Sequence, residues 1–289
     1  MTGPNSKNPG TPYIAGTVSI ATDEECTNIV QVHYSYTTAT TSSNKPNATY
    51  VILENIVNGG LATVMGAGKD AAAKLRIDSA IGLNDFYTDR NGVEELVSAK
   101  RNEGGFMHLV DVLDPEEKNR NTFECDIVIT NVRRIEADED KNLPEKAIIK
   151  GAIFDFRKAL LPVEFTAINP HAIDYFEGLE ASQKEPVFTK IWGRQIAQTI
   201  VREFVEESAF GDARVRKVPN THKDFIITGA NPNPYEWDVE GSLTVTELNE
   251  AITARETYLA TVKQRNDAYK ASKGAAPAVA APAQAQFNF

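Results

Sequence analysis

Most of the chain alternates hydrophobic and polar positions, which is the pattern of half-buried β-strands. Between residues 28 and 40, Val32, Tyr34 and Tyr36 lie out of phase with the polar positions between them. A second β-rich stretch covers residues 13–22, and we expect the two to form a hairpin that turns around residues 23–27. Further strand signals occur in residues 74–87, 95–110, 122–136, 146–157, 160–168, 188–204 and 223–229. The pattern therefore predicts a mainly β fold.

Helical spacing replaces this alternation in three segments. In residues 48–57 apolar side chains recur every three or four positions, and the pair Gly59-Gly60 ends the pattern. Residues 172–179 form a second short helical segment. In residues 246–271 an apolar stripe is flanked by charged side chains, which is typical of a long amphipathic helix. Short inserted helices and one C-terminal helix are expected.

These elements predict two β-modules between irregular ends. Whether they form two modules or one elaborated domain is left open at this point. The expected organisation is a disordered N-terminus at 1–12, β-modules at 13–117 and 118–240, a helix at 241–273 and a disordered Ala/Pro-rich tail at 274–289.

The composition of the chain restricts where the protein is expected to occur and what it is expected to bind. No segment approaches the roughly 20 apolar residues of a membrane span, and the first residues lack the apolar stretch of a signal peptide, so we expect a cytoplasmic protein that does not bind membranes. Cys26 and Cys125 are expected to be reduced packing residues. The net charge of -10 argues against coating of duplex DNA, but it does not exclude binding of single strands.

Motifs of enzyme chemistry are absent from the sequence. There is no nucleophile elbow, dinucleotide fingerprint or complete phosphate loop, since residues 65–70 are too short for one. The acidic run 136–140 is expected to be a solvated loop, with a metal-binding loop as the alternative. The histidines, none at metal-ligand spacing, are His33, His108, His171 and His222. We expect no catalysis, no cofactor and no metal.

Aromatic and basic residues interleave on the expected strands, as a single-strand binder needs, because bases stack on rings while cations contact phosphates. The candidate nucleic-acid-binding residues are Phe86, Tyr87, Lys100, Arg101, Phe106, Phe154, Phe156, Arg157, Lys158, Lys190, Trp192, Arg194, Arg214, Arg216 and Lys217. For Phe154 and Phe156 the alternative is a place in the core. For residues 214–218 it is a charged edge strand that prevents aggregation.

Three passages resemble the single-stranded-DNA-binding proteins of phages and prophages of Gram-positive bacteria. They are LNDFY at 83–87, KRNEGGF at 100–106 and PVFTKIWGR at 186–194. The resemblance implies OB folds, with residues 172–179 as the helix between the third and fourth barrel strands. It also implies that a terminal phenylalanine, here Phe287 or Phe289, recruits replication or recombination proteins, although this tail lacks the usual acidic residues. An unstructured terminus without a partner is the alternative.

The leading hypothesis is a non-enzymatic protein that protects or organises single-stranded DNA in phage replication or recombination. The alternative is a β-rich phage structural or assembly protein whose sheets meet other copies of itself. Homo-oligomers are compatible with both. A hydrolytic enzyme is the third and weakest hypothesis, because no nucleophile with a visible base is present.

Overall fold

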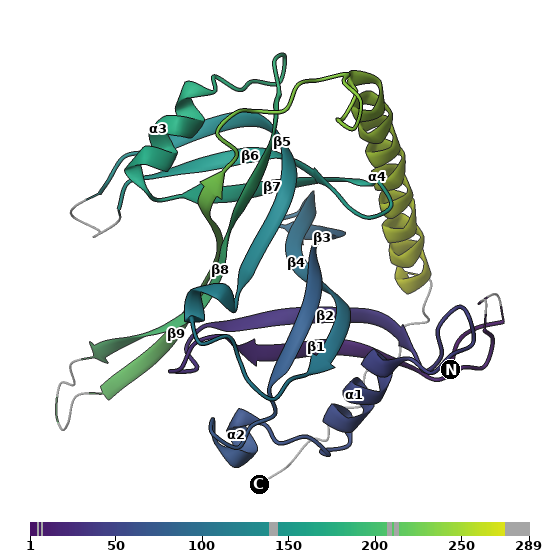
Figure 1. Cartoon of the computed structure of the whole chain (residues 1–289). Helices are drawn as coiled ribbons and strands as arrows, with labels where there is room; N and C mark the ends of the chain where they lie inside the picture. Colours follow the sequence, from purple (N-terminus) through teal and green to yellow (C-terminus); the bar gives the residue numbers. More distant parts are fainter. Residues whose placement is uncertain (5, 7, 139–143, 207–209, 211–213, 275–289) are drawn as a thin grey trace, which may run out of the picture.

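The computed structural model describes residues 1–274 except 5, 7, 139–143, 207–209 and 211–213, and it leaves out the side chains of 198–206, 217–221 and 273–274. The chain is mainly β, as predicted, with short helices and one long C-terminal helix (Figure 1). Its strands are β1 Tyr13–Ala21, β2 Ile29–Thr38, β3 Leu75–Arg90, β4 Val93–Leu109, β5 Thr122–Ile135, β6 Lys146–Phe154, β7 Leu160–Ala167, β8 Val187–Glu206 and β9 Arg214–Ala230. Its helices are α1 Ala48–Val57, α2 Val64–Ala67, the 3-10 turn η1 Glu117–Asn119, α3 Pro170–Gly178 and α4 Val245–Gly274.

The second half of the chain forms a closed barrel in the order β5-β6-β7-β9-β8, with β8 returning to β5. Its interior is filled by alternate side chains such as Ile129, Ile149 and Phe165, each 0% exposed. Helix α3 lies between the third and fourth barrel strands, where it was expected, and Asn169 caps it by accepting a hydrogen bond from the His171 backbone N–H. This strand-helix order is the one expected for an OB barrel.

The first half differs from the expected barrel, because strands β1-β2-β4-β3 form an open four-stranded sheet. The β3–β4 hairpin is too long to stay within this sheet, and β2 pairs with β4 only at Val32 and His33. Farther along the hairpin, Ile81 and Leu83 pack against the core of the second-half barrel. The strands that might have closed a first barrel thus join the two halves of the molecule (Figure 1).

Helix α1 confirms the helical prediction for 48–57 and covers one face of the open sheet, where Leu53 is buried with Val32 and Tyr34. The residues described before β1 are held in place rather than disordered. The Thr2 backbone N–H donates to the Thr11 carbonyl at 2.8 Å, and the Asn8 amide donates to the Thr41 carbonyl at 2.9 Å.

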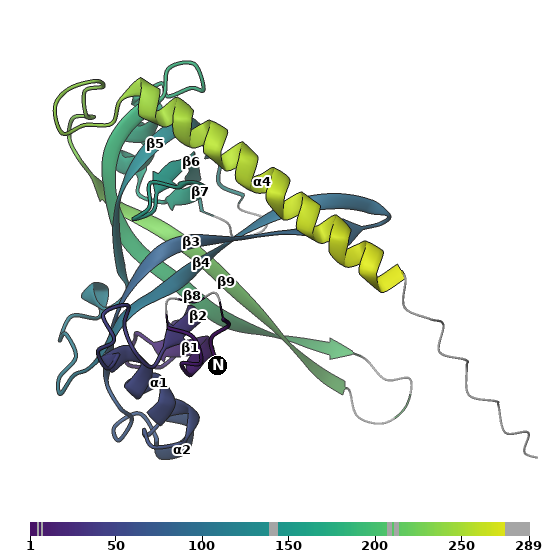
Figure 2. The same cartoon turned by 90° about the vertical axis from the view of Figure 1, so that its right-hand side faces the viewer.

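Helix α4 confirms the predicted C-terminal helix and runs along the β3–β4 hairpin (Figure 2). At its start, Leu248 and Ala251 pack on Ala152, Phe154 and Leu160 of β6 and β7. Farther on, polar contacts with β3 and β4 hold it. No helix among the described residues is long and apolar enough to cross a membrane.

Both cysteines are free thiols, as expected. Cys125 lies on β5 against the barrel core, and burial raises its pKa to about 12. Cys26 lies in the β1–β2 turn, within the turn expected at residues 23–27, and has a φ of 55°.

Candidate nucleic-acid interface

A cleft of about 620 Å³ opens on the outside of the barrel, where β5, β8 and β9 run side by side. The β-strands supply its walls, and η1, just before β5, supplies its rim. The residues that line it are Lys118, Asn119, Thr122, Phe123, Glu124, Trp192, Gly193, Arg194 and Thr228. Two of the predicted binding residues, Trp192 and Arg194, therefore share one site.

Trp192 is placed by a glycine on the neighbouring strand. Trp192 and Gly229 are partners in the β8–β9 ladder, and a Cβ on Gly229 would lie 2.4 Å from Cε2 and Nε1 of the indole. The ring therefore occupies the space that any larger residue at 229 would fill. The side chain is 38% exposed, which leaves ring surface open to the cleft.

The electrostatics of the cleft depend on Arg194, which forms no ion pair or side-chain hydrogen bond with any residue that the structure describes. The carboxylate in the cleft, Glu124, is already paired with Lys190 at 2.9 Å, and this hydrogen bond raises the pKa of Lys190. Lys118 at the rim pairs with Glu116 at 3.5 Å, with both side chains mostly exposed. An anion in the cleft would thus meet an uncommitted guanidinium.

The predicted cluster on β3 and β4 is not brought together as one surface. Phe86 and Phe106 are exposed, but Phe106 lies nine residues along β4 from Val97, the partner of Phe86, or about 30 Å at 3.3 Å per residue. Tyr87 lies under α4, with the Lys263 ammonium 5.2 Å from its ring centre. These aromatics therefore do not form a continuous stacking platform.

The cations of this cluster are occupied within the fold. Lys100 lies over the end of the barrel core, with Nζ 4.2 Å from the centre of the Phe225 ring and 5.1 Å from that of Phe165. It donates to the Glu164 carbonyl oxygen at 2.5 Å, and burial lowers its pKa. Arg101 is paired with Glu103 at 2.5 Å. We conclude that Lys100 in particular has a structural role.

The predicted residues around 154–158 lie at the β6–β7 turn. Phe154 packs beneath α4, as the core alternative predicted. The same alternative is wrong for Phe156, which is 86% exposed because the chain turns between Asp155 and Ala159 instead of extending β6. Of the remaining two cations, Lys158 pairs with Glu247 at 3.2 Å, whereas Arg157 lies 4.9 Å from the Phe156 ring centre and forms no ion pair with any described residue.

The remaining predicted residues lie away from the cleft or beyond the described part of the chain. The β8–β9 hairpin extends beyond the barrel (Figure 2). Arg214 and Arg216 are exposed at the start of β9. Lys217 belongs to the same strand, but its side chain is outside the described set. Phe287 and Phe289 also lie outside the described residues, so recruitment through them is a prediction only.

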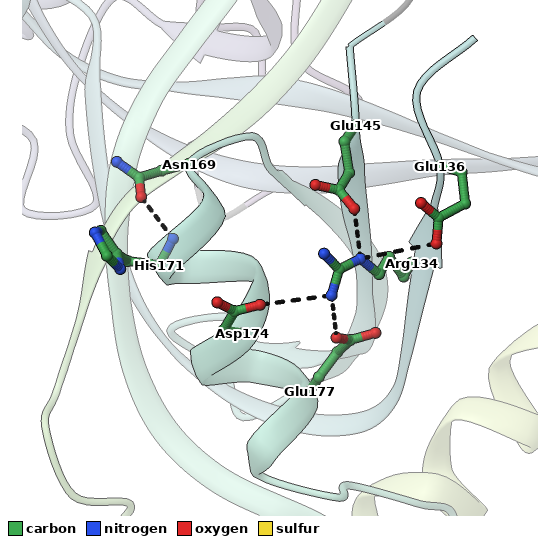
Figure 3. A network of polar contacts seen from close by, with 7 residues as sticks. All are labelled: Arg134, Glu136, Glu145, Asn169, His171, Asp174 and Glu177. Atoms are coloured by element: carbon green, nitrogen blue, oxygen red, sulfur yellow. Dashed lines mark hydrogen bonds and ion pairs between the residues drawn. The ribbon is translucent and has the colours of Figure 1, made fainter.

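The α3 end of the barrel is acidic. Arg134 on β5 is surrounded by Glu145 at 2.5 Å, Glu177 at 2.8 Å, Asp174 at 3.5 Å and Glu136 at 4.0 Å (Figure 3). The hydrogen bond with Glu145 and, after it, the hydrogen bond with Glu177 raise the pKa of Arg134. Four carboxylates exceed one guanidinium, so this end repels phosphate groups. Among residues with described placement, no group of three or more His, Cys, Asp or Glu is arranged to hold a metal ion.

Sequence reasoning missed Lys118, Asn119, Thr122 and Thr228 as members of the cleft. Thr122 and Arg194 are partners in the β5–β8 ladder although they are far apart along the chain. Only this long-range pairing brings the segment before β5 to Trp192. No motif along the chain indicates this pairing.

Comparison with known proteins identifies the family of this chain. No curated protein matches the sequence. The YorF family model matches residues 3–265, a span that includes the open sheet, the barrel and most of α4. The chain therefore belongs to the YorF family.

Proposed function

We propose that this protein binds single-stranded DNA without chemical change to it, and that the cleft around Trp192 is the base-binding site. The observation that carries the proposal is the pairing of an accessible indole with an uncommitted arginine, Arg194, in one cleft. An unpaired base stacks on the ring, and the guanidinium contacts the adjoining phosphate.

The distribution of charge supports binding of phosphate at one place on the protein, the cleft around Trp192. The chain carries a net charge of -10 and an acidic α3 end, so attraction of phosphates is confined to places where cations lack carboxylate partners. Arg194 is such a cation, whereas Lys118 at the rim is paired with Glu116. With about one phosphate neutralised, log K should fall with log salt at a slope of roughly -0.7.

The position of the cleft differs from the usual ligand face of OB barrels, which is centred on the second and third strands. Here those strands are β6 and β7, and α4 covers Ala152 and Leu160 on them. The strands β5, β8 and β9 leave the indole accessible. This is why we place the ligand on that side.

The experiment is a fluorescence-polarisation titration of labelled single-stranded and double-stranded oligonucleotides of one sequence at two salt concentrations. We expect binding of the single strand only, weakened at the higher salt. Equal and negligible binding of both nucleic acids at low salt would overturn the proposal. A labelled RNA in the same assay tests whether the preference is for DNA.

In a phage-infected cell such a binder would act in the cytoplasm, where it protects or organises single strands during replication or recombination. The second candidate, a β-rich structural or assembly protein, is favoured by one observation: strands β1 and β2 contain no Asp, Glu, Lys or Arg. Large regular oligomers that bind no nucleic acid would select this candidate.

A further inference from the structure

The β1–β2 hairpin lacks charge to a degree that is unusual for this protein. Charged residues make up 24% of the chain, yet residues 8–44 contain only Asp23, Glu24 and Glu25, all in the turn between the two strands. His33 is the one other titratable group besides tyrosine and cysteine in that span. The two strands themselves therefore contain no carboxylate, ammonium or guanidinium group.

β1 is also an edge of the open sheet, because β2 is its only neighbour in the strand order. Ala15, Gly16, Thr17 and Ser19 on β1 are all exposed. Edge strands of soluble proteins are usually protected from pairing by charged side chains, proline or a covering element. β1 has no charged residue and no proline, and its only irregularity is the register shift at Ala15, so residues 16–21 form a regular strand without either device.

The opposite edge of the same sheet provides a comparison within the molecule. β3 carries the exposed charged residues Arg76, Asp78, Asp89 and Arg90 along its length. An edge of this kind resists pairing with another strand. The absence of charge is thus specific to the β1 edge and is not a general property of this sheet.

Two exposed tyrosines accompany the uncharged edge. Tyr13 and Tyr36 have ring centres 4.7 Å apart and are 42% and 51% exposed. Tyrosine is enriched and charge is depleted at the centres of protein interfaces. The pair therefore extends the uncharged surface from the strand edge onto the sheet.

We propose that β1 pairs in antiparallel fashion with β1 of a second copy of this chain, around a two-fold axis at Thr17. This register sets Gly16 opposite Val18 in the regular part of β1, after the register shift at Ala15, and Val18 already packs against the core of the open sheet. Two open sheets then become one continuous sheet of eight strands, twice the four of one copy.

A second copy of the chain is the partner of the β1 edge that agrees best with the charge distribution. Two molecules of net charge -10 repel each other where their acidic surfaces meet, so a surface without charge favours their association. Of the two edges of the open sheet, only β1 is such a surface. A basic partner would instead be drawn to the acidic surfaces. The proposal does not depend on nucleic-acid binding, because no residue of β1 lines the cleft.

The test is analytical ultracentrifugation of the full chain and of Thr17→Lys, Thr17→Glu and the control Ser79→Lys on the β3 edge. Like charges directly opposite each other destabilise a strand pair, whereas opposite charges stabilise it. We expect the wild type and Ser79→Lys to be dimers, each Thr17 variant to be a monomer, and an equimolar mixture of the two Thr17 variants to dimerise again.

Circular dichroism melts of all four proteins show that the variants are folded. A monomeric wild type at the highest soluble concentration would overturn the proposal. So would a dimer that persists in Thr17→Lys, because another surface would then hold it. A mixture of Thr17→Lys and Thr17→Glu that stays monomeric would overturn the two-fold pairing at Thr17.

Discussion

The indole ring of Trp192 lies over Gly229, in the space where a Cβ would come within 2.4 Å of the ring atoms Cε2 and Nε1. The two residues face each other across the β8–β9 ladder, so the glycine fixes how the ring is presented to the cleft. Gly229 on β9 thus determines which surface of the Trp192 ring on β8 is accessible.

Replacing Gly229 by Ala should weaken single-strand binding without unfolding the barrel. The new methyl group overlaps the present position of the ring, so Trp192 must move away from β9. We expect a several-fold loss of affinity in the polarisation titration. The control is Gly178→Ala at the end of α3, where a Cβ meets nothing within 4 Å. Equal affinities of the two variants would contradict the positioning role.

Substitutions of Arg194 and of Lys100 should distinguish a cation that binds DNA from one that stabilises the fold. Arg194→Gln removes the unpaired guanidinium of the cleft, so affinity should fall and the salt slope should become shallower by about 0.7. Lys100→Met should leave both quantities unchanged, because its ammonium is bound over the Phe225 ring. If Lys100→Met changed the salt slope instead, the phosphate path would run over the β3–β4 hairpin.

The attachment of α4 should depend on a buried ion pair. Arg255 contacts Asp85 on β3 at 2.5 and 2.8 Å, and the two side chains are 9% and 1% exposed. Arg255→Met leaves Asp85 buried with only the Ser98 hydroxyl as a donor, at a cost of about 3–5 kcal/mol in unfolding free energy.

Urea unfolding measures that loss. Glu247→Gln is the matched control, since it removes the exposed Lys158 pair at the start of the same helix and should cost under about 1 kcal/mol. Similar losses in both variants would show that burial of the Asp85 pair does not decide the docking of α4.

Acid should loosen the far end of α4 through Glu94. Hydrogen bonds from Lys263 and then Lys270 lower the pKa of Glu94 from 4.5 to about 2. A carboxylate with a lowered folded pKa contributes its stability fully above pH 4.5 and loses it as the pH falls toward 2.

We therefore expect Glu94→Gln to reduce the fall in melting temperature between pH 4.5 and 2. The control is Glu256→Gln, at an exposed position of α4. Identical pH dependence in Glu94→Gln and wild type would rule out this contribution.

Local patterns along the chain predicted the elements well. The helix at 48–57 agrees with α1 residue for residue, and the shared face of Trp192 and Arg194 became a shared cleft. The open first sheet could not be predicted, because it depends on where the β3–β4 hairpin packs. The same holds for Lys100 and Tyr87, which look like binding residues until the barrel and α4 cover them. The strand predicted for residues 146–157 ends at Phe154 instead, because alternation alone does not reveal where a strand turns.

The central claim is that a base stacks on Trp192, and the emission of that indole tests it most directly. The chain has two tryptophans, and Trp237 packs beside Phe188 at 5.8 Å between ring centres. In Trp237→Phe the fluorescence reports on Trp192 alone, whereas in Trp192→Phe it reports on Trp237.

We predict that a single-stranded oligonucleotide quenches the emission of Trp237→Phe in parallel with the rise in polarisation and leaves that of Trp192→Phe unchanged. Trp192→Ala should lose about 1–3 kcal/mol, or roughly 5- to 150-fold in affinity. Binding without any change in Trp192 emission, or undiminished binding by Trp192→Ala, would contradict the account.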